Sequence, residues 1–90
     1  MDAAAFEAAL RRDGFTEIET KTVEAKPPSQ PHAHPYDVRA LVLDGEITLT
    51  SEGAARVYRA GDSFNMAAGC VHAENYGPNL TYIFGRRHPA

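Results

Sequence analysis

Three of the four histidines in this sequence have the type and spacing of metal ligands. His32 and His34 are separated by one residue, and His72 follows an Ala-Gly turn further along the chain. Residues i and i+2 of an extended chain point to the same face, so the first two imidazoles can converge on one point. Neutral imidazoles are common ligands of Zn, Fe, Mn, Ni and Cu, and three of them leave positions open for water or substrate. The pattern predicts a divalent metal site, although histidines at the surface or in ordinary hydrogen bonds are also compatible with it.

Glu74 is the carboxylate best placed to act beside these histidines. It lies two residues after His72 and therefore on the same face of an extended chain. From there it can transfer a proton, orient a histidine or bind the metal itself, and we name it as the candidate acid/base group. A solvated carboxylate at a strand end is the alternative. His88 is left out of the site because it lies beside Pro89 at the end of the chain, where termini fray.

Three aromatic residues are candidates for contact with a substrate. Tyr36, Tyr82 and Phe84 can line the mouth of a cavity, because pockets for small molecules are rich in aromatic side chains. The alternative is that they belong to the core. Cys70, the only cysteine, is expected to be a packed thiol or a thiol at the rim.

The elements that must position these residues begin with a short helix over residues 2–13. Asp2 can cap its first turn, alanines favour the helical conformation, and Phe6 and Leu10 share one face. Gly14 supplies the stop. We expect this helix to lie against the rest of the domain or against a partner subunit.

From residue 16 onward the pattern of apolar residues changes to the period of β-strands. Segment 16–25 alternates, and 38–43 is an almost unbroken apolar run. Asp44-Gly45 is a hairpin signal, so 46–50 is expected to return as the partner strand of 38–43. Further strands are predicted at 55–59, 63–66, 71–76 and 80–84. Many short strands separated by turns indicate a sandwich or a closed barrel.

The bulk composition excludes several classes of protein. A chain of 90 residues makes one domain over residues 1–90, with the helix in 1–14 and the β-barrel in 15–87. The net charge of −3 and the scattered Lys and Arg residues argue against a nucleic-acid partner. A single cysteine excludes an internal disulfide. The sequence shows neither a signal peptide nor an apolar run long enough for a membrane span, so a cytoplasmic protein is expected.

Two stretches resemble the conserved motifs of the cupin superfamily. PHAHPYDVRALVLDG, residues 31–45, resembles the first motif, in which two histidines precede an acidic residue and a glycine. GDSFNMAAGCVH, residues 61–72, resembles the second motif, with Ala67 at the usual proline position. The resemblance covers half of the chain. It implies an all-β fold, a jelly-roll antiparallel β-barrel with a metal held inside by His32, His34 and His72.

One position departs from the family pattern. The glutamate ligand of the first motif falls on Val38, which cannot coordinate a metal. Asp37 is one residue earlier, and a bend at Pro35 would bring it inward as a fourth ligand. In a regular strand it would instead face away and pair with Arg39. Both alternatives stay open at this point.

The cupin resemblance does not identify a reaction, because this fold hosts many activities. One hypothesis is a metal-dependent enzyme that acts on a small organic molecule. The other is a module that binds or senses a small molecule or a metal without catalysis. We also expect a homodimer, because sheet edges and the apolar face of Phe6 and Leu10 need cover, and segment 18–23 is the candidate contact.

Overall fold

The computed structural model describes residues 1–89. One helix precedes seven strands, which are α1 (Ala3–Arg12), β1 (Thr16–Val23), β2 (Asp37–Asp44), β3 (Glu46–Ser51), β4 (Ala54–Arg59), β5 (Ser63–Met66), β6 (Ala73–Tyr76) and β7 (Leu80–Arg87). The helix and all seven strands expected from the sequence are therefore present. Within residues 1–89, no helix has the length and apolar character needed to span a bilayer.

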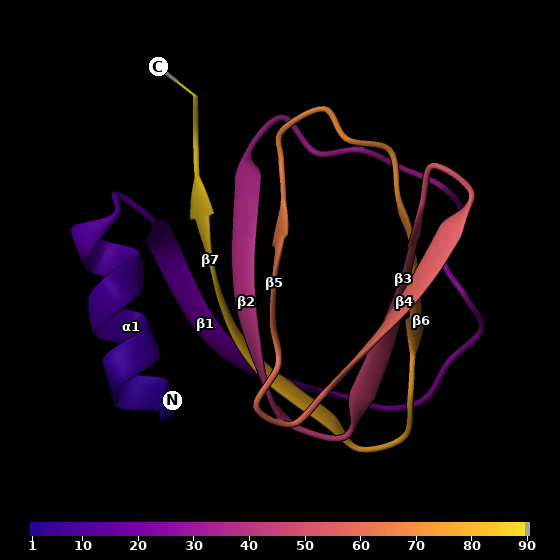
Figure 1. The fold of residues 1–90 in the computed structure, drawn as a ribbon, viewed down its shortest axis with the longest axis horizontal. Helices are drawn as coiled ribbons and strands as arrows, with labels where there is room; N and C mark the ends of the chain where they lie inside the picture. The colour runs from indigo at the N-terminus through magenta and orange to yellow at the C-terminus, as the bar shows by residue number, and fades with distance from the viewer. Residues whose placement is uncertain (90) are drawn as a thin grey trace.

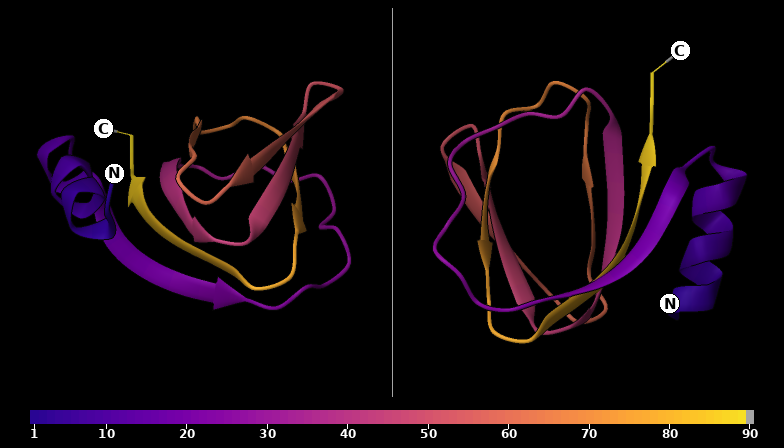
Figure 2. Two further views of the ribbon diagram at one scale, coloured as in Figure 1. Left: turned by 60° about the horizontal axis from the view of Figure 1, so that its bottom comes forward. Right: turned by 180° about the vertical axis from the view of Figure 1, so that it is seen from behind.

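The strands form two antiparallel sheets that face each other (Figures 1 and 2). The first sheet has the order β1-β7-β2-β5 and the second has the order β4-β3-β6. This is a jelly-roll-like cupin arrangement, as the fold class expected from the sequence requires. The two sheets are not joined by hydrogen bonds into a closed barrel, however, so the expectation of a closed barrel was wrong on this point.

Alternation along the strands of the first sheet divides the apolar residues between two cores. Ala40 on β2 lies opposite Phe84 on β7, and both are buried in the space between the sheets. Leu41 and Ile83 point to the other side, where they are buried in a second cluster. The opposite faces of β2 and β7 are thus both covered, which explains why their sequences are nearly continuous apolar runs.

Helix α1 covers the outer face of the first sheet. The Oδ1 atom of Asp2 accepts a hydrogen bond from the backbone N–H of Ala5 at 2.7 Å, which caps the first turn. Phe6 and Leu10 are buried, and they belong to the same cluster as Leu41. The apolar face of the helix is therefore covered by its own sheet, which is one of the two positions expected from the sequence. The expected homodimer consequently gains no support from this face.

The Asp44-Gly45 turn does not form the hairpin that the sequence predicted. β2 pairs with β5 on one edge and β7 on the other, so no edge is left for β3. β3 crosses to the second sheet and pairs with β4 and β6 instead. Gly45 makes this crossing possible, because its φ is +75° and a Cβ atom there would lie 2.7 Å from the carbonyl oxygen of Asn79.

The segment between β1 and β2, residues 24–36, carries two of the candidate ligands. It leaves the first sheet at the end of β1, passes along the second sheet and returns to β2 (Figures 1 and 2). Ser29 bonds to Glu74 of β6, and His32 bonds to His72 just before β6. This path brings the first motif against the second motif.

Candidate metal centre

The side chains of His32, His34, His72 and Glu74 converge between the two sheets. One potential ligand atom from each of them lies within 4.8 Å of the corresponding atoms of the other three. The centroids of the three imidazole rings are 4.5 to 5.2 Å apart. The structure therefore brings together the three histidines expected from their spacing, and it adds the carboxylate of Glu74.

Backbone pairing between the two motifs holds these side chains in place. His32 and His72 form an antiparallel bridge, in which each N–H donates to the carbonyl of the other at 2.8 Å. The N–H of Gly69 donates to the carbonyl oxygen of His34 at 2.8 Å. Each histidine of the first motif is thus tied to the second motif by backbone hydrogen bonds, which limits how far the rings can separate.

The hydrogen bonds of the histidine rings direct their Nε2 atoms toward the cluster. The Nδ1 atom of His32 lies 2.8 Å from the carbonyl oxygen of Gln30, and the Nδ1 atom of His72 lies 3.0 Å from that of Cys70. A carbonyl oxygen only accepts, so both Nδ1 atoms carry a proton. In the neutral rings, each Nε2 atom then presents a lone pair, as metal-binding imidazoles do.

Glu74 directs one carboxylate oxygen at these lone pairs. Its Oε1 atom lies 3.2 Å from the Nε2 atom of His72 and 3.5 Å from that of His32. Its Oε2 atom accepts a hydrogen bond from the hydroxyl of Tyr76. The backbone N–H of Glu74 donates to the Oγ atom of Ser29 at 2.8 Å. Both the side chain and the main chain of Glu74 are therefore fixed.

These residues fit a divalent cation. The Nε2 atom of His72 is buried, since the residue is 3% exposed, and it has no hydrogen-bond partner among the described residues. An unpaired acceptor buried in this way is costly unless a cation or a proton satisfies it. With neutral rings, the acceptor atoms of His32, His72 and Glu74 point at one another, and a positive ion between them removes that conflict.

The electrostatic surroundings favour the protonation states that a metal site requires. Burial, followed by the neighbouring His32 and His72, lowers the pKa of His34, so its ring stays neutral. Burial and then the hydrogen bond to Glu74 raise the pKa of Tyr76, which keeps its phenol protonated as a donor. Burial raises the pKa of Tyr82 to about 12, with the charge of Glu74 as a smaller cause.

Asp37 lies outside this cluster, so the alternative in which a bend at Pro35 brings it inward as a fourth ligand does not match the structure. Its Oδ1 atom accepts from the backbone N–H of Ala68 at 2.9 Å, and its Oδ2 atom pairs with Arg87 at 3.0 Å. The alternative pairing with Arg39 is also absent, because Arg39 binds Asp13 at 2.6 Å. The N–H of Ala68 and the guanidinium of Arg87 hold the pKa of Asp37 below its ordinary value. Asp37 thus anchors the turn that precedes His72.

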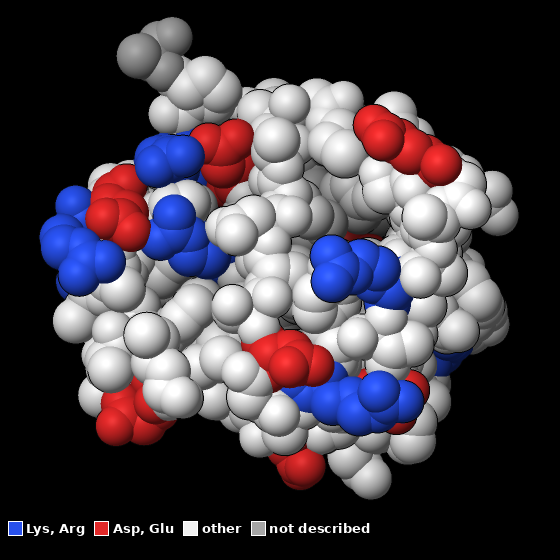
Figure 3. Space-filling view, viewed as in Figure 1, with Lys and Arg blue, Asp and Glu red and all other residues white. Residues whose placement is uncertain are grey.

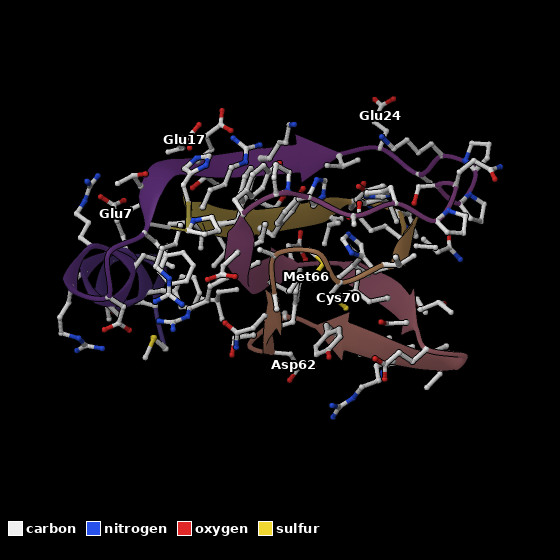
Figure 4. The ribbon with its side chains drawn as sticks, turned by 90° about the horizontal axis from the view of Figure 1, so that it is seen from above. Glu7, Glu17, Glu24, Asp62, Met66 and Cys70 are labelled. Carbon is white, nitrogen blue, oxygen red and sulfur yellow. The ribbon has the colours of Figure 1, made fainter. Side chains whose placement is uncertain are left out.

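A cavity of about 440 Å³ adjoins the cluster. All three aromatic residues expected to contact a substrate, Tyr36, Tyr82 and Phe84, are among the residues that line it. A smaller cavity of about 190 Å³ is lined by His72 and Cys70. Met66 lines both. The face of the molecule in Figure 3 is hollowed between the two sheets, and Figure 4 shows Met66 and Cys70 in the space between them.

Sequence reasoning missed two residues that position Glu74. Tyr76 could have been found, because it lies two residues beyond Glu74 and shares its strand face. The role of Ser29 could not be predicted from the sequence, since its hydrogen bond with Glu74 depends on where segment 24–36 passes along β6. His88, which was left out of the predicted site, pairs with Glu17 at 2.5 Å and lies outside the cluster.

Comparisons with known proteins agree with this geometry. A family model described as "Cupin domain" matches residues 19–77. No curated protein matches the chain. Among solved structures, a cupin superfamily protein from Desulfitobacterium hafniense DCB-2 superposes with a TM-score of 0.70 at 15% identity, over 80% of this chain and 66% of that one.

Two further structures share the fold. One is a "putative mannose-6-phosphate isomerase" from Ralstonia eutropha JMP134, with a TM-score of 0.70 at 26% identity, over 87% of this chain and 78% of that one. The other is a protein of unknown function from Streptococcus pyogenes, with a TM-score of 0.66 at 16% identity, over 82% of this chain and 76% of that one. Together with the family model, which spans more than half of the sequence, these matches show that the chain belongs to the cupin family.

Proposed function

We propose that this cupin binds a divalent transition metal through His32, His34, His72 and Glu74, and a small organic molecule in the cavity beside it. The observation that carries the proposal is the buried Nε2 atom of His72, which has no hydrogen-bond partner among the described residues and faces the Oε1 atom of Glu74 at 3.2 Å. A divalent ion would satisfy this atom and the carboxylate together.

The ligand atoms indicate a class of metal ion, the divalent transition metals, and not a single element. Three imidazole nitrogens and one carboxylate oxygen suit Zn, Fe, Mn, Ni or Cu. Cys70 does not belong to the cluster, which leaves the set without a thiolate. When bound, such an ion would supply a Lewis acid next to the cavity.

The residues around the cluster have supporting roles in this proposal. Tyr76 and Ser29 hold Glu74 so that its Oε1 atom stays directed at the imidazoles. Tyr82 and Phe84 stack at 5.1 Å between ring centroids and supply a flat apolar wall for the organic part of a ligand. Tyr36 stacks on His34 at 5.0 Å and keeps that ring oriented at the cavity wall.

Catalysis and binding without catalysis remain the two candidate activities. Glu74 as an acid/base group stays a prediction, and it requires that the carboxylate be released from the cluster. Binding without catalysis is favoured by the geometry of this side chain, because its Oε1 atom faces the imidazoles and its Oε2 atom is held by Tyr76. The Ralstonia protein's name makes sugar-phosphate isomerisation one reaction to include in a screen.

Metal analysis of protein purified without a histidine tag tests the proposal directly. We expect about one divalent transition ion per chain. Replacement of all three histidines by alanine should abolish it, whereas His88→Ala should not. Retention of the same metal content by the triple variant would show that the site is assigned to the wrong residues.

A further inference from the structure

The cavity beside the metal cluster is lined by an excess of positive charge. Lys21, Lys26 and Arg86 line it, and Glu74 is the only carboxylate among its lining residues. Glu74 is already engaged by Tyr76 and the imidazoles. The chain as a whole is acidic, with 9 Lys and Arg residues against 12 Asp and Glu residues. Three of the basic residues of this net-acidic chain thus line one cavity.

The register of the strands directs these cations toward the aromatic wall. Lys21 of β1 lies opposite Tyr82 of β7, so the two side chains share a face of the sheet. Arg86 follows Phe84 at i+2 on β7 and shares its face, with its guanidinium 5.4 Å from the Phe84 ring centre. The Nζ atom of Lys26 lies 4.7 Å from the centre of the Tyr76 ring. The charges therefore adjoin the surface on which an organic ligand would lie.

Two of these cations have no ion-pair partner among residues 1–89. Lys21 and Lys26 form no salt bridge there, and Arg86 has only Glu17 at 3.7 Å. Glu17 is also bound by His88 at 2.5 Å. Glu24 is close in sequence, but its labelled side chain points away from the space between the sheets in Figure 4. The positive charge at the cavity is therefore available to a ligand.

We propose that the cavity binds a small organic anion. Its acid group, a carboxylate or a phosphate, is bound by the cations that line the cavity, Lys21, Lys26 and Arg86. Its carbon skeleton lies against Tyr82 and Phe84. A second polar group faces the cluster of histidines and Glu74, and only this last contact rests on the proposed metal site.

Charge complementarity is the physical reason for preferring an anion. An acid group would form charge-assisted hydrogen bonds with Lys21, Lys26 or Arg86 that a neutral ligand cannot form, and these bonds are the stronger kind. A divalent ion on the cluster would add further positive charge, because only one carboxylate is present to offset it. Both parts of the cavity thus favour negative charge on the ligand.

Matched neutral and anionic probes test the proposal. Benzoate, benzamide and phenyl phosphate are titrated into ¹⁵N-labelled protein as purified, and amide shifts are followed by NMR. We expect benzoate to bind about tenfold or more tightly than benzamide, with shifts at Lys21, Tyr82 and Arg86. The comparison of benzoate with phenyl phosphate identifies the preferred acid group.

Variants connect this preference to the three cations. The triple variant Lys21→Gln, Lys26→Gln, Arg86→Gln should bind benzoate and benzamide with similar affinity. Arg59→Gln removes a cation that does not line the cavity and should leave the preference intact. Equal binding of the two probes by the wild type, no shift with either acid at millimolar concentration, or an unchanged preference in the triple variant would each overturn the proposal.

The same samples separate this inference from the metal proposal. Their metal content is measured alongside each titration, and their thermal midpoints confirm that the variants are folded. Protein that contains no metal but still prefers benzoate would contradict the metal site and support the anion site. Protein that contains metal but binds benzoate and benzamide equally would support the metal site and contradict the anion site.

Discussion

His32 and His72 face each other across an antiparallel bridge, and the N–H of each donates to the carbonyl of the other at 2.8 Å. Their ring centroids are 4.5 Å apart, and both Nε2 atoms lie within 3.5 Å of the Oε1 atom of Glu74. The bridge joins the segment before β2 to the segment before β6. The two cupin motifs are thus held together by main-chain bonds that do not depend on a metal, so the candidate ligands are positioned without one.

We predict that His72→Ala removes most of the bound metal. The change deletes the most deeply buried candidate ligand and leaves two imidazoles and one carboxylate, which hold a divalent ion far less tightly than the full set. Metal content by mass spectrometry is the measurement, and His88→Ala is the matched control because His88 lies outside the cluster. Equal metal loss in both variants would contradict the assignment.

Glu74→Gln should lower metal affinity by about tenfold or more, because an amide oxygen carries no charge to offset the ion. Asp37→Asn should leave metal affinity unchanged, since Asp37 binds Ala68 and Arg87 instead of the cluster. Competition against a chromophoric chelator measures the metal affinity of both variants. If the protein is an enzyme, Glu74→Gln should also reduce turnover by roughly 10²-fold. A larger affinity loss for Asp37→Asn than for Glu74→Gln would reverse the ligand assignment.

Asp37 should stabilise the fold in a manner that depends on pH. Its pKa in the folded protein is lowered from its ordinary value of 3.8, first by the hydrogen bond from Ala68 and then by Arg87. A carboxyl whose pKa is lowered in the folded protein stabilises the fold at pH values above its ordinary pKa. This stabilisation is lost as the pH falls through the lowered pKa. Asp37→Asn should therefore destabilise the protein near neutral pH and less so at about pH 3.

Urea unfolding at the two pH values measures this difference. Glu24→Gln is the control, because Glu24 forms no ion pair among the described residues and should show a smaller change at neutral pH. A destabilisation by Asp37→Asn that is the same at both pH values would show that the charge of the carboxylate is not what stabilises the turn.

Tyr76→Phe should weaken metal binding without removing a ligand. The change deletes the hydroxyl that donates to the Oε2 atom of Glu74, so the carboxylate loses the contact that fixes its direction. Groups that orient metal ligands in this way typically contribute about 10-fold or more in affinity. Tyr58→Phe is the matched control, since Tyr58 packs against the same core but does not donate to Glu74 among the hydrogen bonds of residues 1–89. An equal effect of the two changes would rule out the positioning role.

We predict that the protein is a homodimer joined along β1. Within residues 1–89 this strand pairs with β7 alone, which leaves its other edge without a paired strand there, and segment 18–23 lies along that edge. A stable contact there would bury about 1,000 Å² or more in total. Light scattering over a range of micromolar concentrations measures the mass, and a monomer mass throughout would refute the dimer.

The helix, the seven strands and the three histidines could be predicted because their signals are local. The cap at Asp2 and the period of apolar residues depend only on neighbours in the chain. His32 and His34 could be expected to converge because extended chains alternate. The departure at Val38 left Asp37 and Glu74 as the candidate carboxylates beside the three histidines.

Only the tertiary structure decided which of the two carboxylates lies beside the histidines. Asp37 and Glu74 are both acidic residues close to a histidine in sequence, and their roles differ because Asp37 meets Arg87 while Glu74 meets Tyr76. The crossing of β3 to the second sheet and the gathering of Lys21 and Arg86 at one cavity depend in the same way on strand pairing. Such contacts join segments that are far apart in the chain. Their geometry follows from strand register and sheet order, and the pattern of apolar residues within a single strand does not predict either.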